Sequence, residues 1–245
     1  MVHLAKRFSK YSMVATLLLV GGILVVSDGR AVAADDAGGP AAAPSYRRGD
    51  AFIYDNGRVE RFAGSNDGGL VWRFLSGRKF VRDASFFVPI LQWNTSRSKG
   101  ARILSGAPRK IWPLRPGKST RFSIVTNATS RRGDQDWKDA KSRRSAQFWK
   151  CRTGQETEIE VPAGVFAVLP IACVQFSSGT MRKLRQRIWY YAPGVGHYVR
   201  LESTSYMTGR HSVYSLVAAL SGRRANRKRL RAIVRAIRQR NKAAS

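Results

Sequence analysis

The chain has 245 residues, with 44 Lys and Arg against 15 Asp and Glu, and its formal net charge is +29. Hydrophobic residues make up 43% of the chain and aromatic residues 10%, which excludes an intrinsically disordered protein and allows a sizeable core. Two cysteines and three histidines are too few for a multi-metal enzyme or a disulfide-knotted miniprotein, so we expect no cofactor. The excess of positive charge favours anionic partners.

Residues 1–33 have the organisation of a secretory signal peptide. Three basic residues precede an apolar run at 13–26, and the small-x-small sequence Ala31-Val32-Ala33 follows. The run has about 14 residues, fewer than the roughly 20 that span a bilayer, although an uncleaved anchor is the alternative. We expect cleavage between Ala33 and Ala34 and a mature protein in the periplasm, or secreted.

Removing the signal peptide takes away only four basic residues, so the basicity belongs to the mature chain. Charge alone would point to nucleic acid, but an exported protein does not meet it in the cytoplasm. The expected partners are anionic lipid or lipopolysaccharide surfaces, together with an apolar ligand.

The mature chain begins with small residues and proline at 34–45, which predict a flexible leader. An antiparallel β domain is expected over residues 46–221, because short apolar segments alternate with turn sequences such as Asn56-Gly57. In the first half, the expected strands are 51–54, 58–62, 70–75, 78–82, 86–93, 101–104, 111–114 and 121–126. A solvated loop or short helix is expected at 130–145.

The second half has a stronger pattern. Its expected strands are 146–152, 156–161, 165–176, 181–191, 198–203 and 213–220. The strand at 165–176 is apolar on both faces, so we expect it to be covered on both, on the outside by an element such as a helix.

Residues 222–245 predict a basic amphipathic helix. Leu230, Ile233, Val234 and Ile237 follow the i, i+3, i+4, i+7 spacing of one apolar stripe, and no acidic residue occurs in this tail. The stripe either covers the sheet or lies in a membrane interface, and we favour the sheet.

Cys151 and Cys173 lie in separate expected strands. Since an exported chain meets an oxidising compartment, we expect them to form a disulfide that closes a loop of about 23 residues. Two buried thiols are the alternative.

The sequence does not predict an enzyme. His197 and His211 have no metal-ligand spacing, and we interpret His197 as a surface residue of a strand. Glu156, Glu158 and Glu160 alternate along one strand, which is typical of a solvated face. A hydrolase would require a pocket that brings one of the histidines to a carboxylate.

Lys183, Arg185 and Arg187 also alternate, so they share one face of a strand. A solvated outer face is the favoured interpretation, and an anion-binding groove is the alternative. Further candidates for anion binding come from the tail, and they are Arg223, Arg224, Arg227, Lys228, Arg229 and Arg231. The nearby aromatic residues Trp189, Tyr190, Tyr191 and Tyr198 are expected to pack in the core or on a sheet face.

Two segments carry a family resemblance: Val161-Pro-Ala-Gly-Val-Phe166 and Trp189-Tyr-Tyr-Ala-Pro-Gly-Val-Gly196. They resemble exported bacterial domains of unknown function related in shape to the LolA-like and LolB-like lipoprotein-localisation half-barrels. The motif residues are Pro162, Gly164, Phe166, Trp189, Tyr191, Pro193, Gly194 and Gly196. The resemblance implies a mainly β fold, in which a curved antiparallel sheet forms a half-barrel around a helix. It also implies a concavity that holds apolar ligands in some relatives, and no catalytic residues.

The expected function is that of a non-catalytic envelope protein. It would bind an apolar or amphipathic ligand and associate with anionic envelope components through its basic face and tail. The alternatives are a cationic binding module for polysaccharide or nucleic acid and, third, a hydrolase.

Overall fold

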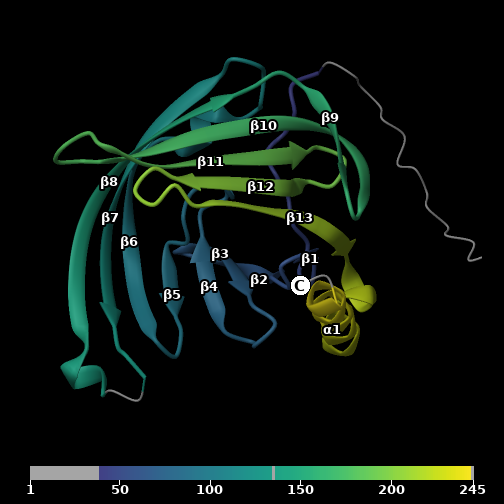
Figure 1. Ribbon diagram of the computed structural model, residues 1–245. Coiled ribbons are helices and arrows are strands. Elements are labelled where there is room, and N and C mark those ends of the chain that lie inside the picture. Colours follow the sequence, from purple (N-terminus) through teal and green to yellow (C-terminus); the bar gives the residue numbers. More distant parts are fainter. Residues whose placement is uncertain (1–38, 134–135, 244–245) are drawn as a thin grey trace, which may run out of the picture. The chain divides into compact units, whose positions relative to one another are not determined.

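Short strands joined by tight turns form a single antiparallel sheet (Figure 1). The computed structural model describes residues 39–133 and 136–243, which belong to one compact unit at 34–245. The expected signal peptide and its cleavage site lie outside the described residues. The strands are β1 (Ala51–Tyr54), β2 (Val59–Asn66), β3 (Gly69–Arg73), β4 (Lys79–Arg82), β5 (Gln92–Asn94), β6 (Ser98–Gly106), β7 (Ser119–Ser130), β8 (Lys141–Thr153), β9 (Thr157–Val161), β10 (Gly164–Ser177), β11 (Lys183–Ala192), β12 (His197–Ser205) and β13 (His211–Leu220).

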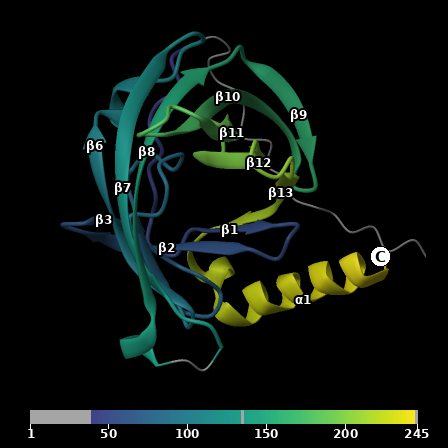
Figure 2. The ribbon, with the colours of Figure 1, turned by 60° about the vertical axis from the view of Figure 1, so that its left-hand side comes forward.

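The sheet closes into a barrel (Figures 1 and 2). Neighbouring strands follow the order β11-β12-β13-β1-β2-β3-β4-β5-β6-β7-β8-β10, and β10 pairs again with β11. In the described part of the chain this ring has 12 strands, and β9 pairs outside it with the beginning of β10. The expected open half-barrel is therefore wrong. The ring closes because β13 pairs with β1, a contact between distant segments that local sequence patterns do not reveal.

The expected strand at 86–93 is wrong except at its end, which belongs to β5, and the expected strand at 111–114 is wrong. The apolar residues of both segments instead plug the barrel. Phe86, Phe87 and Val88 are fully buried in the connection between β4 and β5. Farther on, η1 (Pro108–Ile111) is a 3-10 helix with Ile111 buried. A short apolar run has the same pattern whether it is a strand or a plug, so periodicity does not separate the two. Residues 130–145 contain η2 (Trp137–Asp139), but β8 already begins at Lys141.

Aromatic side chains fill the plugged part of the interior. The rings of Tyr54 and Tyr198 stack at 5.1 Å, and those of Phe122 and Trp149 at 5.9 Å. Trp72 has 1% exposure and packs against the rings of Phe52 and Phe62. Such contacts contribute about 0.5–1.5 kcal/mol each beyond the buried area. This part of the barrel is therefore a packed core.

The C-terminal helix covers the outside of the barrel (Figure 2). α1 (Arg227–Ala243), which follows η3 (Gly222–Ala225), buries Leu230, Val234 and Ile237 against Ile53 and Val59. The prediction that the apolar stripe covers the sheet is confirmed. Its expected place over 165–176 is wrong, because the strand that it covers is β1, whose alternate side chains fill the barrel.

Residues 39–45, which we expected to belong to a flexible leader, run along the barrel. Ala41 and Leu114 exchange two backbone hydrogen bonds, of 3.0 and 2.8 Å. The Tyr191 hydroxyl donates to the carbonyl of Ala42 at 3.0 Å. None of the helices in the described part of the chain has the length and apolar character needed to cross a membrane.

Candidate ligand cavity

The unplugged part of the barrel holds a cavity of about 910 Å³, within the range of about 300–1,000 Å³ that is common for ligand sites. Six guanidinium groups line it, which gives the space its name here, the arginine cavity. They belong to Arg58, Arg82, Arg102, Arg185, Arg187 and Arg210.

Apolar and hydroxyl groups complete the wall. The apolar side comes from Phe86, Val88, Pro89, Ile90, Trp189 and Leu201, and the hydroxyls from Tyr198, Ser203, Ser205, Thr208, Ser212 and Tyr214. The plug between β4 and β5 thus gives the cavity most of its apolar floor. The polar groups come from β11, β12, β13 and the turn after β12, and from Arg58, Arg82 and Arg102. The cavity is suited to a ligand with both an apolar and an anionic part.

Among the described residues, two of these arginines, Arg58 and Arg82, have a carboxylate partner. Glu60 is fully buried and accepts two hydrogen bonds from Arg82, at 3.2 and 3.0 Å. It also forms an ion pair with Arg58 and accepts a hydrogen bond from the Tyr198 hydroxyl at 3.2 Å. Burial acts to raise the pKa of Glu60, but the charges of Arg58 and Arg82 overcome it and hold this pKa well below its usual range. Glu60 is therefore a fixed anion.

His197 is buried beside this carboxylate, so its interpretation as a surface residue is wrong. Its Nε2 lies 3.6 Å from Glu60, and its Nδ1 shares a 2.8 Å hydrogen bond with the Tyr46 hydroxyl. Burial lowers the pKa of His197 to about 4, and the negative charge of the nearby Glu60 only partly opposes this shift. The imidazole is thus neutral near pH 7. The sequence around Glu60 gives no sign that this carboxylate lies beside His197.

This histidine and carboxylate are packed in the core. The ring of His197 stacks on Phe52 at 4.0 Å, and neither His197 nor Glu60 lines the arginine cavity. Glu60 is held by two arginines, and its lowered pKa makes it a weak base. His211, on the other hand, is exposed and pairs with the Thr204 hydroxyl at 3.0 Å.

Arg187 is a cavity cation whose charge is disfavoured by burial. It faces Cys173 across the β10–β11 ladder, and its guanidinium lies 5.8 and 5.9 Å from the ring centroids of Trp149 and Trp189. In the part of the chain that the structure describes, no carboxylate contacts it. Burial, and next the charge of Arg185, lower the pKa of Arg187 to about 10. The folded barrel therefore destabilises this positive charge.

The favoured interpretation of the alternating basic residues as a solvated outer face is wrong. Arg185 and Arg187 point into the barrel, opposite Gln175 and Cys173, whereas Lys183 is exposed where β11 begins. The sequence pattern established that the three share a face, but not which face lies inside.

Arg102, Arg58, Arg82 and Arg210 were not identified from the sequence. Arg102 donates to the carbonyl of Ile90 and to the hydroxyl of Thr126 and lies 4.4 Å from the ring centroid of Trp93. Arg58 donates to the Tyr214 hydroxyl at 3.1 Å. One feature of the sequence could have indicated that Arg58 faces the interior. Arg58, Glu60 and Phe62 alternate, so the two charged residues share a strand face with an aromatic residue.

The structure separates the tail from this cavity. The tail candidates Arg223, Arg224, Arg227, Lys228, Arg229 and Arg231 are exposed on η3 and α1, outside the barrel. Glu156, Glu158 and Glu160 are likewise exposed, at β9.

The motif residues have structural places. Pro162 and Gly164 lie at the turn between β9 and β10, and Pro193, Gly194 and Gly196 at the turn between β11 and β12. Gly196 has a φ of 68°, which favours glycine. Trp189, Tyr191 and Tyr198 are buried, whereas Phe166 and Tyr190 are partly exposed.

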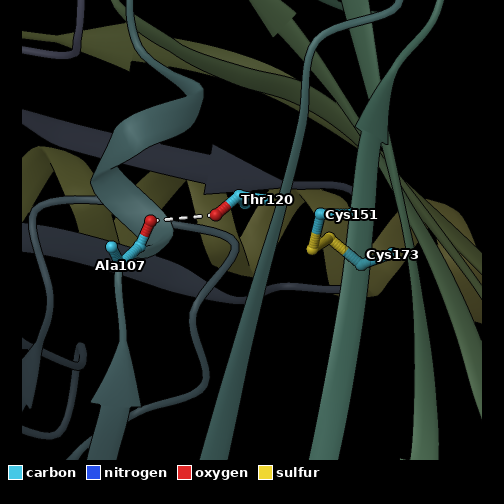
Figure 3. The surroundings of a disulfide bond; sticks show 4 residues. All are labelled: Ala107, Thr120, Cys151 and Cys173. Atoms are coloured by element: carbon cyan, nitrogen blue, oxygen red, sulfur yellow. Dashed lines mark hydrogen bonds between the residues drawn. A yellow bond between two sulfur atoms is a disulfide. The ribbon is translucent and has the colours of Figure 1, made fainter.

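The two cysteines are bonded across adjacent strands (Figure 3). Cys151 of β8 and Cys173 of β10 face each other in the ladder, with an S–S distance of 2.01 Å. On the next strand, the Thr120 hydroxyl donates to the carbonyl of Ala107 at 2.9 Å (Figure 3). Within residues 39–133 and 136–243, no group of three or more His, Cys, Asp or Glu side chains could hold a metal ion.

Comparisons with known proteins gave structural neighbours only. No protein-family model and no curated protein matched the chain. The hypothetical lipoprotein YmcC from Escherichia coli K12 is 6% identical, with 71% of this chain and 84% of that chain covered and a TM-score of 0.45. A Bacteroides fragilis NCTC 9343 protein, described as exported with a YmcC-like fold, is 11% identical, with 74% of this chain and 100% of that chain covered and a TM-score of 0.38. Neither description mentions LolA-like or LolB-like proteins, so that resemblance stays a prediction.

Proposed function

We propose that this chain is a non-catalytic, exported binding protein that takes an amphipathic ligand with an anionic group into the arginine cavity. The observation that carries the proposal is the pair Arg185 and Arg187, which line a cavity of about 910 Å³ without a carboxylate partner in the described residues. Export is inferred from the signal-peptide pattern of residues 1–33.

The anionic part of the ligand follows from the charge of the wall. Six arginines and the single carboxylate network of Glu60 leave an excess of positive charge around one space. A protein loses stability when it holds cations together away from water, unless an anion compensates them. A carboxylate, phosphate or sulfate group between Arg185 and Arg187 would supply this compensation through charge-assisted hydrogen bonds.

The apolar part follows from the floor. Phe86, Val88 and Leu201 present apolar surface to the same space, and they belong to the plug and to β12. An inorganic anion would leave this surface in contact with water. A ligand with an acyl or other apolar portion covers it and gains about 25 cal/mol for each Å² that it buries.

The direct test is a fluorescence titration of the mature protein with dansylaminoundecanoic acid, an anionic amphiphile, and with its uncharged methyl ester. We expect the acid to bind more tightly than the ester. Arg187→Gln should weaken binding of the acid by about tenfold, since one charge-assisted hydrogen bond is lost. The matched control is Arg152→Gln, because Arg152 is exposed on the outer face of β8.

Three outcomes overturn the proposal. Equal affinity for acid and ester would remove the anionic requirement. Unchanged binding in Arg187→Gln would place the ligand elsewhere. An equal loss in Arg187→Gln and Arg152→Gln, with a steep dependence on salt, would favour a cationic module that attracts polyanions through net charge.

A further inference from the structure

Two turns at the end of the barrel that holds the arginine cavity expose apolar side chains among basic residues. The first turn joins β10 to β11 and holds Met181, and the second joins β12 to β13 and holds Tyr206 and Met207. Their exposed fractions are 51%, 45% and 51%. Large apolar residues exposed in this way have a cost in water that a partner can remove.

The two turns form one surface, which we name the rim and define as residues 178–182 and 206–210. The backbone N–H of Tyr206 donates to the carbonyl of Leu184 at 3.1 Å, and its hydroxyl donates to Gln186 at 2.9 Å. Figure 1 shows both turns at the same end of strands β10 to β13. The rim is therefore a continuous feature held together across β11.

The rim is basic throughout. Arg182 and Arg210 are exposed within it, Lys183 follows it directly, and the segments 177–183 and 205–211 contain no acidic residue. Apolar side chains that project between cations are the combination that binds the interface of an anionic bilayer, where the apolar groups enter the headgroup region and the cations meet phosphates.

The rim also borders the arginine cavity. Thr208 and Arg210 of the second turn line the cavity, and so does Arg185, which lies just beyond the first turn. A bilayer bound to the rim would thus lie where an amphipathic ligand enters.

Met181 has a backbone that is unusual for its type. Its φ is 52°, in the left-handed region, and it is the one non-glycine residue with positive φ in the part of the chain that the structure describes. Asparagine or glycine would adopt this conformation at lower cost. An exposed methionine at this position therefore benefits neither the turn nor the core.

We propose that the rim is a docking surface for an anionic lipid bilayer, through which the arginine cavity receives its ligand. The delivery of a ligand to the cavity rests on the proposed function, whereas binding of the rim to a bilayer does not. The partner is a membrane surface, and the exposed basic face of α1 is the competing site on this chain.

The test is co-sedimentation of the mature protein with vesicles of phosphatidylglycerol and phosphatidylcholine, and with vesicles of phosphatidylcholine alone. We expect binding to the anionic vesicles. The double variant Met181→Asn, Met207→Ser should weaken it by roughly tenfold, because two apolar side chains no longer enter the interface. Both residues are exposed, and Asn tolerates positive φ, so the barrel should keep its stability.

The matched control is Ile103→Ser, Val165→Ser. These residues are exposed by 59% and 55%, comparable to the methionines, but they lie on β6 and β10 away from the rim. The control should bind anionic vesicles like the wild type. A second comparison is Arg231→Glu, Arg235→Glu on α1, which we expect to have a smaller effect than the rim variant.

Unchanged binding in the rim variant would overturn the inference. So would an equal loss in the Ile103, Val165 control, or a loss found in the α1 variant alone, which would assign docking to the helix. Failure of the proposed function is recognised separately, because Arg187→Gln should still bind vesicles and the rim variant should still bind dansylaminoundecanoic acid.

Discussion

Arg187 lies directly opposite Cys173 on the neighbouring strand of the barrel. Cys173 is in turn bonded to Cys151 on the strand beyond. This cavity cation is thus placed beside the covalent link between β8 and β10. A side chain held on such a fixed wall loses little freedom when an anion binds, which favours affinity.

The first prediction concerns the cost of that cation. Arg187→Met should raise the free energy of unfolding in urea by about 1–2 kcal/mol, because an uncompensated charge is replaced by an apolar side chain of similar length. The methionine keeps contact with Trp149 and Trp189. The matched control Arg152→Met, on the outer face, should change stability by less than about 0.5 kcal/mol. A clear loss of stability in Arg187→Met would mean that the guanidinium has a partner in the free barrel.

The second prediction concerns pH. His197 has a pKa lowered to about 4 from an ordinary value of 6.5, so the unfolded chain takes up a proton that the folded chain does not. Stability should therefore fall by up to about 3 kcal/mol as the pH falls from about 6.5 to 4. At still lower pH, protonation of Glu60 lowers the free energy of unfolding further. The pKa of Glu60 is lowered in the folded state, so this carboxylate stabilises the fold only while it is charged.

The measurement is urea unfolding at several pH values in that range. His197→Gln should flatten the dependence, whatever its effect on stability at pH 7. His211→Gln is the matched control, since His211 is exposed, and it should keep the wild-type slope. The same slope in both variants would show that His197 is not the group responsible.

The third prediction concerns the disulfide. Its cysteines are separated by 22 positions, and a loop of this size contributes roughly 3 kcal/mol in the chain-entropy model. Cys151→Ala, Cys173→Ala should lower the free energy of unfolding by about that amount, as should a reductant acting on the wild type. A reductant should leave the double variant unchanged. A further loss with reductant in that variant would contradict the assignment.

The fourth prediction concerns the helix. Leu230, Val234 and Ile237 are buried between α1 and the barrel. Val234→Ala should lower the free energy of unfolding by about 1–3 kcal/mol, and Leu230→Ala by about 2–4 kcal/mol. Arg231→Ala and Arg235→Ala, on the exposed face, should have little effect. If the apolar changes altered only vesicle binding, the helix would be an interfacial element.

Much of the fold was predictable because it is local. The turn Asn56-Gly57, the alternating strands of the second half and the stripe on α1 all follow from nearest-neighbour chemistry. Closure was not predictable, because it depends on the pairing of β1 with β13. The plug at Phe86 and Phe87 was mistaken for a strand for the same reason, since only the closed ring creates an interior for it to fill.

The site was predicted only in part. The alternation of Arg185 and Arg187 correctly predicts that they share one face of a strand. It does not indicate whether that face lies inside or outside a barrel. The sequence does not predict the burial of His197, because nothing near it along the chain indicates that Glu60 or Tyr46 will contact it. Buried charged networks assemble residues from separate strands, and a single sequence does not record which strands become neighbours.

The pairing of Ala51 with Leu220 also determines when the barrel is able to form. The entropy of closing a long loop must be overcome before these strands meet, so the β1–β13 ladder is expected to form late in folding. Until then β1 has an unpaired edge, and Ile53 lacks the cover that α1 provides. A chain that emerges with its N-terminus first therefore remains an open, aggregation-prone sheet until β13 and α1 have also emerged. A chaperone would protect the chain during that interval.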